Sequence, residues 1–207
     1  MVSLKNTLKF RAVCRFVLLN NTFVTHSRFA QINADMLLKS YSRNNLWIQI
    51  PRPQPNKPTK PFIFWSAGDY GRAEDQPNIM AFQYQPDWRT DVDYDGLDWG
   101  VGTNPFIWTV RQGQTGGFTS LEAFAQAIGI EKHGRRVHRE EIFEDPDVLA
   151  YAADSFPSRR LTLRPGSNAI DAGRAVPNLS APFTGSSPDL GAHEHGRPAT
   201  HYGPRPR

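Results

Sequence analysis

Apolar and polar positions form short, interrupted runs along the first fifty residues of the chain. The run "FVLLNNTFV" (16–24) passes from four apolar residues to Asn20-Asn21 and then resumes with Thr-Phe-Val. The run "SYSRNNLWIQI" (40–50) places Asn44-Asn45 before Leu-Trp-Ile in the same way. The two Asn pairs lie 24 residues apart, within the period of about 20–50 residues that indicates stacked repeats. The pattern predicts a turn between two short strands at each pair.

Asparagine suits such turns because it adopts a positive φ more easily than most residues. If the two turns stack, equivalent side chains lie one strand spacing apart, roughly 4.8 Å, and their amides can hydrogen-bond as a ladder. We therefore predict structural turn or ladder positions at Asn20, Asn21, Asn44 and Asn45. Two unrelated Asn-Asn turns are the alternative interpretation.

Two C-terminal motifs carry a family resemblance. The segments "LTLRPGSNAIDAG" (161–173) and "FTGSSPDLGAHEHG" (183–196) resemble the closing segment of right-handed parallel β-helix proteins of the pectate-lyase-like superfamily. Asn168 stands where proline is usual in that motif. The stretch "TDVDYDGLDW" (90–99) is similar to a strand of the same proteins. The resemblance implies structural turn positions at Asp171 and Asp189.

The resemblance implies an all-β fold: a right-handed parallel β-helix (solenoid), present in part, with an aromatic-rich loop insertion and one short α-helix. Its expected units are β-helix coils at 1–50, a Pro- and aromatic-rich insertion at 51–88, terminal coils and closing segment at 89–196, and a flexible tail at 197–207. Thr119 and Glu122 form a capping box that predicts the helix near 120–128, and Gly129 is its expected stop. The few coils visible predict the C-terminal part of a longer chain, so the missing N-terminal part is an expected partner.

The five tryptophans lie within one stretch of the chain. Exposed aromatic rings form flat platforms for sugar rings, and nearby Lys or Arg can hold uronate carboxylates. The candidate carbohydrate-binding residues are Trp47, Trp65, Trp88, Trp99 and Trp108. Alternatively, these rings pin the insertion against the rest of the fold.

The motif "DVDYDG" (91–96) matches the first half of a calcium loop. Asp91, Asp93 and Asp95 are therefore weak calcium candidates, although the twelfth position is Gly102 rather than glutamate. Two histidine motifs, "EKHGRRVHREE" (131–141) and "GAHEHG" (191–196), lack a convincing set of ligands. We expect no cofactor, with calcium as a weak exception.

Charge is distributed unevenly, and this changes the expected partners. Residues 1–60 carry a net charge of +9, residues 61–150 carry −8, and residues 151–207 carry +3. A basic face can meet an acidic polymer, but no nucleic-acid signature is present, so we expect no nucleic acid. No run of about 18 apolar residues predicts a membrane span, and no signal peptide is recognisable. The single cysteine, Cys14, excludes an internal disulfide.

No catalytic constellation stands out in the sequence. We therefore expect the C-terminal part of a polysaccharide-associated protein, structural or carbohydrate-binding rather than catalytic by itself. A fragment of a polysaccharide lyase or glycoside hydrolase is one alternative, and a structural or adhesive surface protein is another. The resemblance implies an extracellular or cell-surface location for the parent protein, with a polysaccharide or surface glycan as its partner.

Overall fold

The structure is a computed structural model of the 207-residue chain. It describes residues 2–3, 8–11, 16–25, 30–33, 40–50, 66–67, 90–99, 106–111, 114–145 and 161–198. Nearly all of the insertion predicted at 51–88 lies outside these residues. Within the described ranges, no helix is long and apolar enough to cross a membrane.

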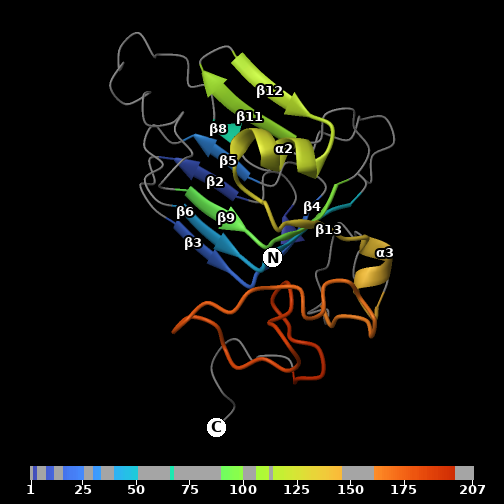
Figure 1. Cartoon of the computed structure of the whole chain (residues 1–207). Helices are drawn as coiled ribbons and strands as arrows, with labels where there is room; N and C mark the ends of the chain where they lie inside the picture. Colours follow the sequence, from blue (N-terminus) through green and yellow to red (C-terminus); the bar gives the residue numbers. More distant parts are fainter. Residues whose placement is uncertain are drawn as a thin grey trace.

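Three parallel sheets form the centre of the molecule (Figure 1). The first has the order β1 (Val2–Ser3), β4 (Thr22–Thr25), β7 (Leu46–Gln49), β10 (Gly96–Asp98) and β13 (Arg135–Arg136). The second contains β2 (Leu8–Arg11), β5 (Ala30–Asn33) and β8 (Ser66–Ala67). The third contains β3 (Phe16–Leu19), β6 (Ser40–Arg43) and β9 (Thr90–Asp93). From β1 to β10, consecutive strands enter the three sheets in turn.

The strand register places three turns of the chain in one line. Leu19 pairs with Arg43, and Arg43 pairs with Asp93, at the ends of β3, β6 and β9. Thr22 pairs with Leu46, and Leu46 pairs with Gly96, at the starts of β4, β7 and β10. The turns 20–21, 44–45 and 94–95 therefore lie side by side. We call this line of turns the corner column.

The remaining described elements are helices and an antiparallel pair. Strands β11 (Phe106–Arg111) and β12 (Gln114–Phe118) pair antiparallel. Helix α2 (Leu121–Ile128) follows, and its N-cap is Ser120, whose side chain accepts a hydrogen bond from the Ala123 amide. The cap is thus Ser120 rather than the predicted Thr119, and Gly129 ends the helix with a φ of 84°. Helix α3 (Arg139–Ile142) lies after β13.

The predicted fold class, an all-β solenoid with one short helix, is wrong. The described residues combine parallel sheets with an antiparallel pair and two helices, α2 and α3. Residues 161–198, expected to be largely terminal coils, form turns and loops in which Leu163 makes only an isolated bridge to Phe143. Backbone sterics explain the difference, because a positive φ interrupts extended backbone. Such φ values recur at Gly166, Asp171, Asn178, Gly185 and Gly191.

Strand β7 separates two apolar clusters. Side chains on a strand point alternately to opposite faces, and every side chain of β7 is buried. Trp47 belongs to a cluster with Phe23, Leu97, Phe106 and Phe124. Leu46 and Ile48 belong to the other cluster, which includes Ala169, Ala172 and Leu190 of the C-terminal segment. The C-terminal segment therefore covers the face of the first sheet that is opposite Trp47.

Candidate functional site

The corner column begins with a backbone conformation that repeats from turn to turn. Asn20, Asn44 and Tyr94 have φ values of 51°, 58° and 60°. Asparagine tolerates this left-handed region well, whereas tyrosine rarely adopts it. Tyr94 is held there by its neighbours: its amide donates to Asp93 Oδ1 at 2.9 Å, and its carbonyl accepts the Asn44 amide at 3.2 Å. The asparagine repeat in the sequence does not extend to this third turn.

A ladder of polar side chains follows at the next position of each turn. The backbone amide and the side-chain amide of Asn21 both donate to Asn45 Oδ1, each at 2.9 Å. The backbone amide and the side-chain amide of Asn45 in turn donate to Asp95 Oδ1, at 2.8 and 3.1 Å. Two asparagines and one aspartate thus form a continuous hydrogen-bonded column across the three turns.

The carboxylate of Asp95 is fully buried at the end of this ladder. Its second oxygen, Oδ2, accepts hydrogen bonds from Ser42 Oγ at 2.9 Å and from Trp47 Nε1 at 3.0 Å. Burial raises the pKa of Asp95 to about 6, although the hydrogen bonds from Asn45, Trp47 and Ser42 oppose the rise. Four donors on two oxygens make this a well-satisfied carboxylate.

A second acid, Glu131, is buried against the same turn. Its Oε2 accepts the Asp95 backbone amide at 3.3 Å. Its Oε1 is buried and has no hydrogen-bond partner within the described residues. Burial raises the pKa of Glu131 well above its usual range, and the charges of Asp95 and Asp93 raise it further. Two acids that meet in the interior were not predicted from the sequence.

The three weak calcium candidates have separate partners. Asp91 is exposed and forms an ion pair with Arg43. Asp93 accepts the His133 backbone amide at 2.6 Å and contacts His133 Nδ1 at 2.7 Å. Both carboxylate oxygens of Asp95 already accept hydrogen bonds, from Asn45, Ser42 and Trp47. Among the described residues, no group of three or more His, Cys, Asp or Glu side chains is arranged to hold a metal ion.

The tryptophans proposed as sugar platforms differ in their surroundings. Trp47 is fully buried, so the prediction that its ring stacks on a sugar is wrong for this structure. Trp99 is half-buried, and the Arg136 guanidinium lies 4.5 Å from its ring centre. Trp65 and Trp88 lie outside the described residues, and the structure places Trp108 on β11 without describing its side chain.

Asp171 and Asp189 order the C-terminal loops. Asp171 has a φ of 52°, and its Oδ1 accepts the amides of Ser186 and Ser187 at 2.7 and 3.0 Å. Asp189 is buried, and its two oxygens accept the amides of Asp171 and His195 at 2.8 and 2.5 Å. Each carboxylate therefore joins turns that are 6–18 residues apart in the chain.

The C-terminal loops are fastened to the corner column by side-chain hydrogen bonds. Asn44 Oδ1 accepts the Arg174 amide at 2.7 Å, and Asn44 Nδ2 donates to the Arg174 carbonyl at 2.9 Å. Asn20 Nδ2 donates to the Asp189 carbonyl at 3.4 Å. Thr22 Oγ1 accepts the Ala192 amide at 3.0 Å. One asparagine side chain thus satisfies two backbone groups of a distant segment.

Replacing Asn44 by alanine is expected to lower the free energy of unfolding by about 2 kcal/mol, because two hydrogen bonds are lost and alanine is strained at a positive φ. Asn44→Gly removes the same hydrogen bonds without that strain, so it should cost about half as much. Urea denaturation of both variants measures the difference. Equal losses in the two variants would show that backbone strain has no part in the choice of asparagine.

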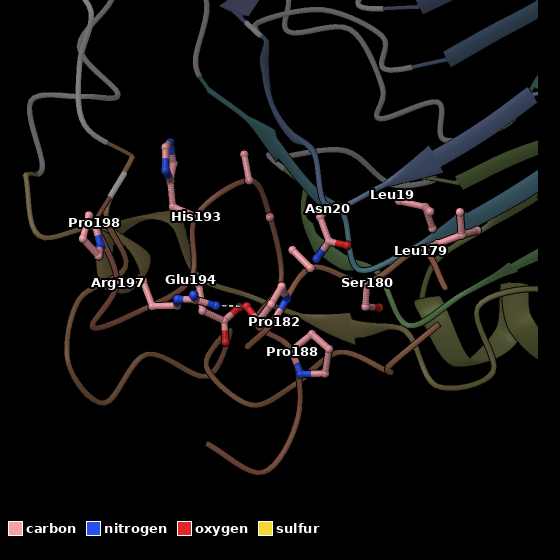
Figure 2. Close-up of a pocket in the computed structure, with 13 residues that line it drawn as sticks. Leu19, Asn20, Leu179, Ser180, Pro182, Pro188, His193, Glu194, Arg197 and Pro198 are labelled. Atoms are coloured by element: carbon pink, nitrogen blue, oxygen red, sulfur yellow. Dashed lines mark hydrogen bonds between the residues drawn. The ribbon is translucent and has the colours of Figure 1, made fainter. Parts of the chain in front are cut away.

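A cleft opens between the first turn of the corner column and the C-terminal loops (Figure 2). Its volume is about 450 Å³, which is within the range of about 300–1,000 Å³ typical of small-molecule sites. We call it the C-terminal cleft. It is lined by Leu19, Asn20, Leu179, Ser180, Ala181, Pro182, Pro188, Gly191, Ala192, His193, Glu194, Arg197 and Pro198.

Charged and polar groups stand beside proline rings in this cleft. Glu194 uses Oε1 to accept the Thr184 amide at 3.1 Å and Oε2 to accept the Asp189 amide at 3.2 Å. Arg197 Nη1 donates to the Pro182 carbonyl, the contact drawn as a dashed line in Figure 2. Burial lowers the pKa of His193, so its imidazole is neutral at pH 7, and burial raises the pKa of Glu194.

Sequence reasoning found only part of the C-terminal cleft. The sequence predicts Asn20 as a turn residue, but for the motif that contains His193 and Glu194 it indicates only that a convincing set of metal ligands is lacking. In the structure, residues 191–198 form bends and turns. Arg197 was assigned to a flexible tail, yet it lines the cleft. No local pattern indicated that residues 179–198 would close around residues 19–20.

Comparisons of the chain with protein-family models, with curated proteins and with solved structures found no match. The family resemblance therefore stays a prediction, and the function must be argued from the site.

Proposed function

We propose that this chain is a non-catalytic carbohydrate-binding protein and that the C-terminal cleft is its binding site. The observation that carries the proposal is the mixed lining of the cleft, in which hydrogen-bonding side chains stand next to proline rings. A sugar ring has the matching surface, with hydroxyl groups at its edge and apolar C–H groups on its faces. A polysaccharide or glycan of the cell surface or extracellular space is the ligand that we expect.

Three side chains supply the polar contacts. Asn20 offers an amide that can donate and accept, and the Ser180 hydroxyl, which accepts the Val176 amide at 2.7 Å, keeps its own hydrogen to donate. Arg197 adds a positive charge at the exposed rim of the cleft. A guanidinium binds carboxylates through charge-assisted hydrogen bonds. This side chain favours sugars that carry a uronate group over neutral sugars.

Binding fits the site better than catalysis does. Glycoside hydrolysis commonly uses two carboxyl groups that flank the scissile bond. Among the described residues that line the cleft, Glu194 is the one carboxylate, and both of its oxygens accept backbone amides. A lyase needs a base within reach of the proton that it removes, and the Glu194 oxygens are already engaged in holding the loops.

The proposal is tested with the whole purified chain on an array of neutral and uronate-containing oligosaccharides, followed by calorimetry with the best ligand. Arg197→Ala should weaken binding of an acidic oligosaccharide about tenfold, because a charge-assisted hydrogen bond is lost. Arg135→Ala is the matched control: this exposed arginine also donates to a carbonyl, that of Asn168 at 3.4 Å, but it does not line the cleft. The Arg135→Ala variant should bind the acidic oligosaccharide with the same affinity as the unmodified chain.

Other outcomes separate the alternatives. Release of new reducing ends or of unsaturated uronate products would replace the binding proposal with an enzymatic one. No binding to any oligosaccharide at millimolar concentration would leave a structural or adhesive role. Equal weakening by Arg197→Ala and Arg135→Ala would place the binding site outside the C-terminal cleft.

A further inference from the structure

Two acidic side chains from distant parts of the chain meet in the interior, and no cation of the described segments pairs with either of them. Asp95 and Glu131 are 36 residues apart in the chain, and the two residues are 0% and 1% exposed, respectively. Four ion pairs are found among the described residues, and none of them involves Asp95 or Glu131. Two buried, unpaired negative charges are costly, so such a site favours taking up a proton instead.

The hydrogen bonds indicate which carboxyl group carries that proton. Asp95 accepts from four donors through both oxygens, which is the pattern of an ionised carboxylate. Glu131 accepts one backbone amide through Oε2, and its Oε1 has no donor in the described part of the chain. A carboxyl group that lacks donors is stabilised as the neutral acid.

We propose that Asp95 and Glu131 hold a single proton between them in the folded protein at neutral pH, carried on Glu131, and that loss of this proton releases residues 131–134 from the corner column. The pair thus holds the β9–β10 turn against the segment that connects α2 to β13 while the proton is bound, and releases that segment when the proton is lost. This inference is independent of the carbohydrate-binding proposal, because neither acid lines the C-terminal cleft.

Residues 131–134 are held against the corner column by Glu131 and by His133, whose ring stacks on that of Tyr94 with centroids 4.6 Å apart. The Glu131 amide donates to the Val92 carbonyl at 2.8 Å, and Glu131 adopts a positive φ of 54°. Its side chain folds over Gly134, where an added β-carbon would lie 2.5 Å from Oε2. Arg135, the residue after Gly134, donates its amide to the Asp95 carbonyl at 3.0 Å and begins β13. Repulsion between the two ionised carboxylates would therefore act on the residues immediately before β13.

The surrounding groups determine the direction of the pH effect. Asp93 is the third acid near the pair, and it is paired with His133 from the same loop as Glu131. Arg43 is directed to Asp91, and the groups that contact Asp95 from β6, β7 and the turn between them, Ser42, Asn45 and Trp47, are uncharged. Burial, followed by the Asp95 and Asp93 charges, raises the pKa of Glu131 in the folded state. The unfolded chain releases this proton at lower pH, so stability is greatest below the unfolded pKa and falls as pH rises towards the folded pKa.

The test compares the unmodified chain with Glu131→Gln, which imitates the neutral acid at every pH. Urea denaturation between pH 7 and pH 9, where Asp95 is already ionised, should show the folded-to-unfolded ratio of the unmodified chain falling by up to about tenfold per pH unit over part of this range. Glu131→Gln should lose this dependence. Glu122→Gln, at an exposed acid on α2, is the matched control and should keep it. His133→Asn separates any contribution of the His133–Asp93 pair.

A second measurement keeps the proposal falsifiable if Glu131→Gln does not fold. Infrared spectroscopy of the native, unmodified chain at pH 7 should show the carbonyl band of a protonated carboxylic acid, which disappears as the pH is raised. Amide hydrogen exchange at residues 131–136 should then accelerate beyond the intrinsic effect of pH. A Glu131→Gln variant with unchanged pH dependence, or a native protein without a protonated carboxyl band at pH 7, would overturn the proposal.

Discussion

Asp95→Ala is expected to lower the free energy of unfolding by about 3–5 kcal/mol, the range found when one partner of a buried polar network is removed. The substitution leaves four donors without their acceptor: the Asn45 backbone and side-chain amides, the Ser42 hydroxyl and the Trp47 indole. These donors are buried, so water cannot replace the lost acceptor without opening the corner column. Urea denaturation at pH 7 measures the loss.

Asp91→Ala is the matched control for this prediction. Asp91 lies on the neighbouring strand β9, its side chain is 63% exposed, and it forms an ion pair with Arg43, a buried residue that also donates to the Ser42 and Asp91 carbonyls. Arg43 keeps its two carbonyl hydrogen bonds when this exposed carboxylate is removed, so the control should lower stability by only about 1 kcal/mol. Similar losses for the two variants would mean that the Asp95 network contributes no more than an ordinary surface charge.

Trp47→Ala has the second large expected effect, again about 3–5 kcal/mol, because truncation of a buried aromatic side chain removes apolar contacts and leaves a cavity. Trp47 is fully buried, and its ring stacks on Phe23 with centroids 4.3 Å apart. Its indole nitrogen also donates to Asp95, so both the packing and the polar network are lost. Thermal or urea denaturation measures the sum of these losses.

Trp47→Phe separates the two contributions. Phenylalanine keeps most of the ring contact with Phe23 but cannot donate to Asp95, so this variant should lose about 1–2 kcal/mol. Because both side chains share one network, Trp47→Phe and Asp95→Ala should be less than additive when combined. Full additivity would contradict a direct energetic link between the indole and the carboxylate.

The first two turns of the corner column could be anticipated because their information is local. Asn20 and Asn44 are residues that tolerate the φ values of 51° and 58° observed there. Their spacing of 24 residues equals the sequence separation between Leu19 and Arg43, which pair in the third sheet. The asparagine repeat does not predict that the third turn stacks on the first two, because Tyr94-Asp95 has no asparagine and follows Asn44 after 50 residues rather than 24.

The three weak calcium candidates point to separate partners around this turn for a geometric reason. A calcium loop must curl around its ion, whereas β9 keeps Asp91 and Asp93 on extended backbone. The positive φ of Tyr94 then turns the chain, and Asp95 enters the interior. Glu131 was missed because no local pattern links it to a residue 36 positions earlier.

The fold class was wrong where short motifs were extended to whole segments. The Pro-Gly-Ser and Pro-Asp-Leu-Gly-Ala motifs identified turns well, but turns with glycine at positive φ do not continue into strands. The antiparallel pairing of Phe106–Arg111 with Gln114–Phe118 went unnoticed, although the two segments are separated by only two residues. The C-terminal cleft depends on contacts between residues about 170 positions apart, which a sequence pattern cannot reveal.

The fastening of the C-terminal loops to the corner column also affects how the chain can fold. Asn44 binds Arg174 across 130 residues, and Thr22 binds Ala192 across 170. Closing loops of this length costs conformational entropy before the contacts compensate for it, so such topologies fold slowly. During synthesis, the first of these turns must wait for the 170 residues between Thr22 and Ala192 to leave the ribosome before its hydrogen bonds to the C-terminal loops can form. A nascent chain with unsatisfied turns and uncovered strand β7 is therefore the state in which this protein is most exposed to misfolding and to chaperones.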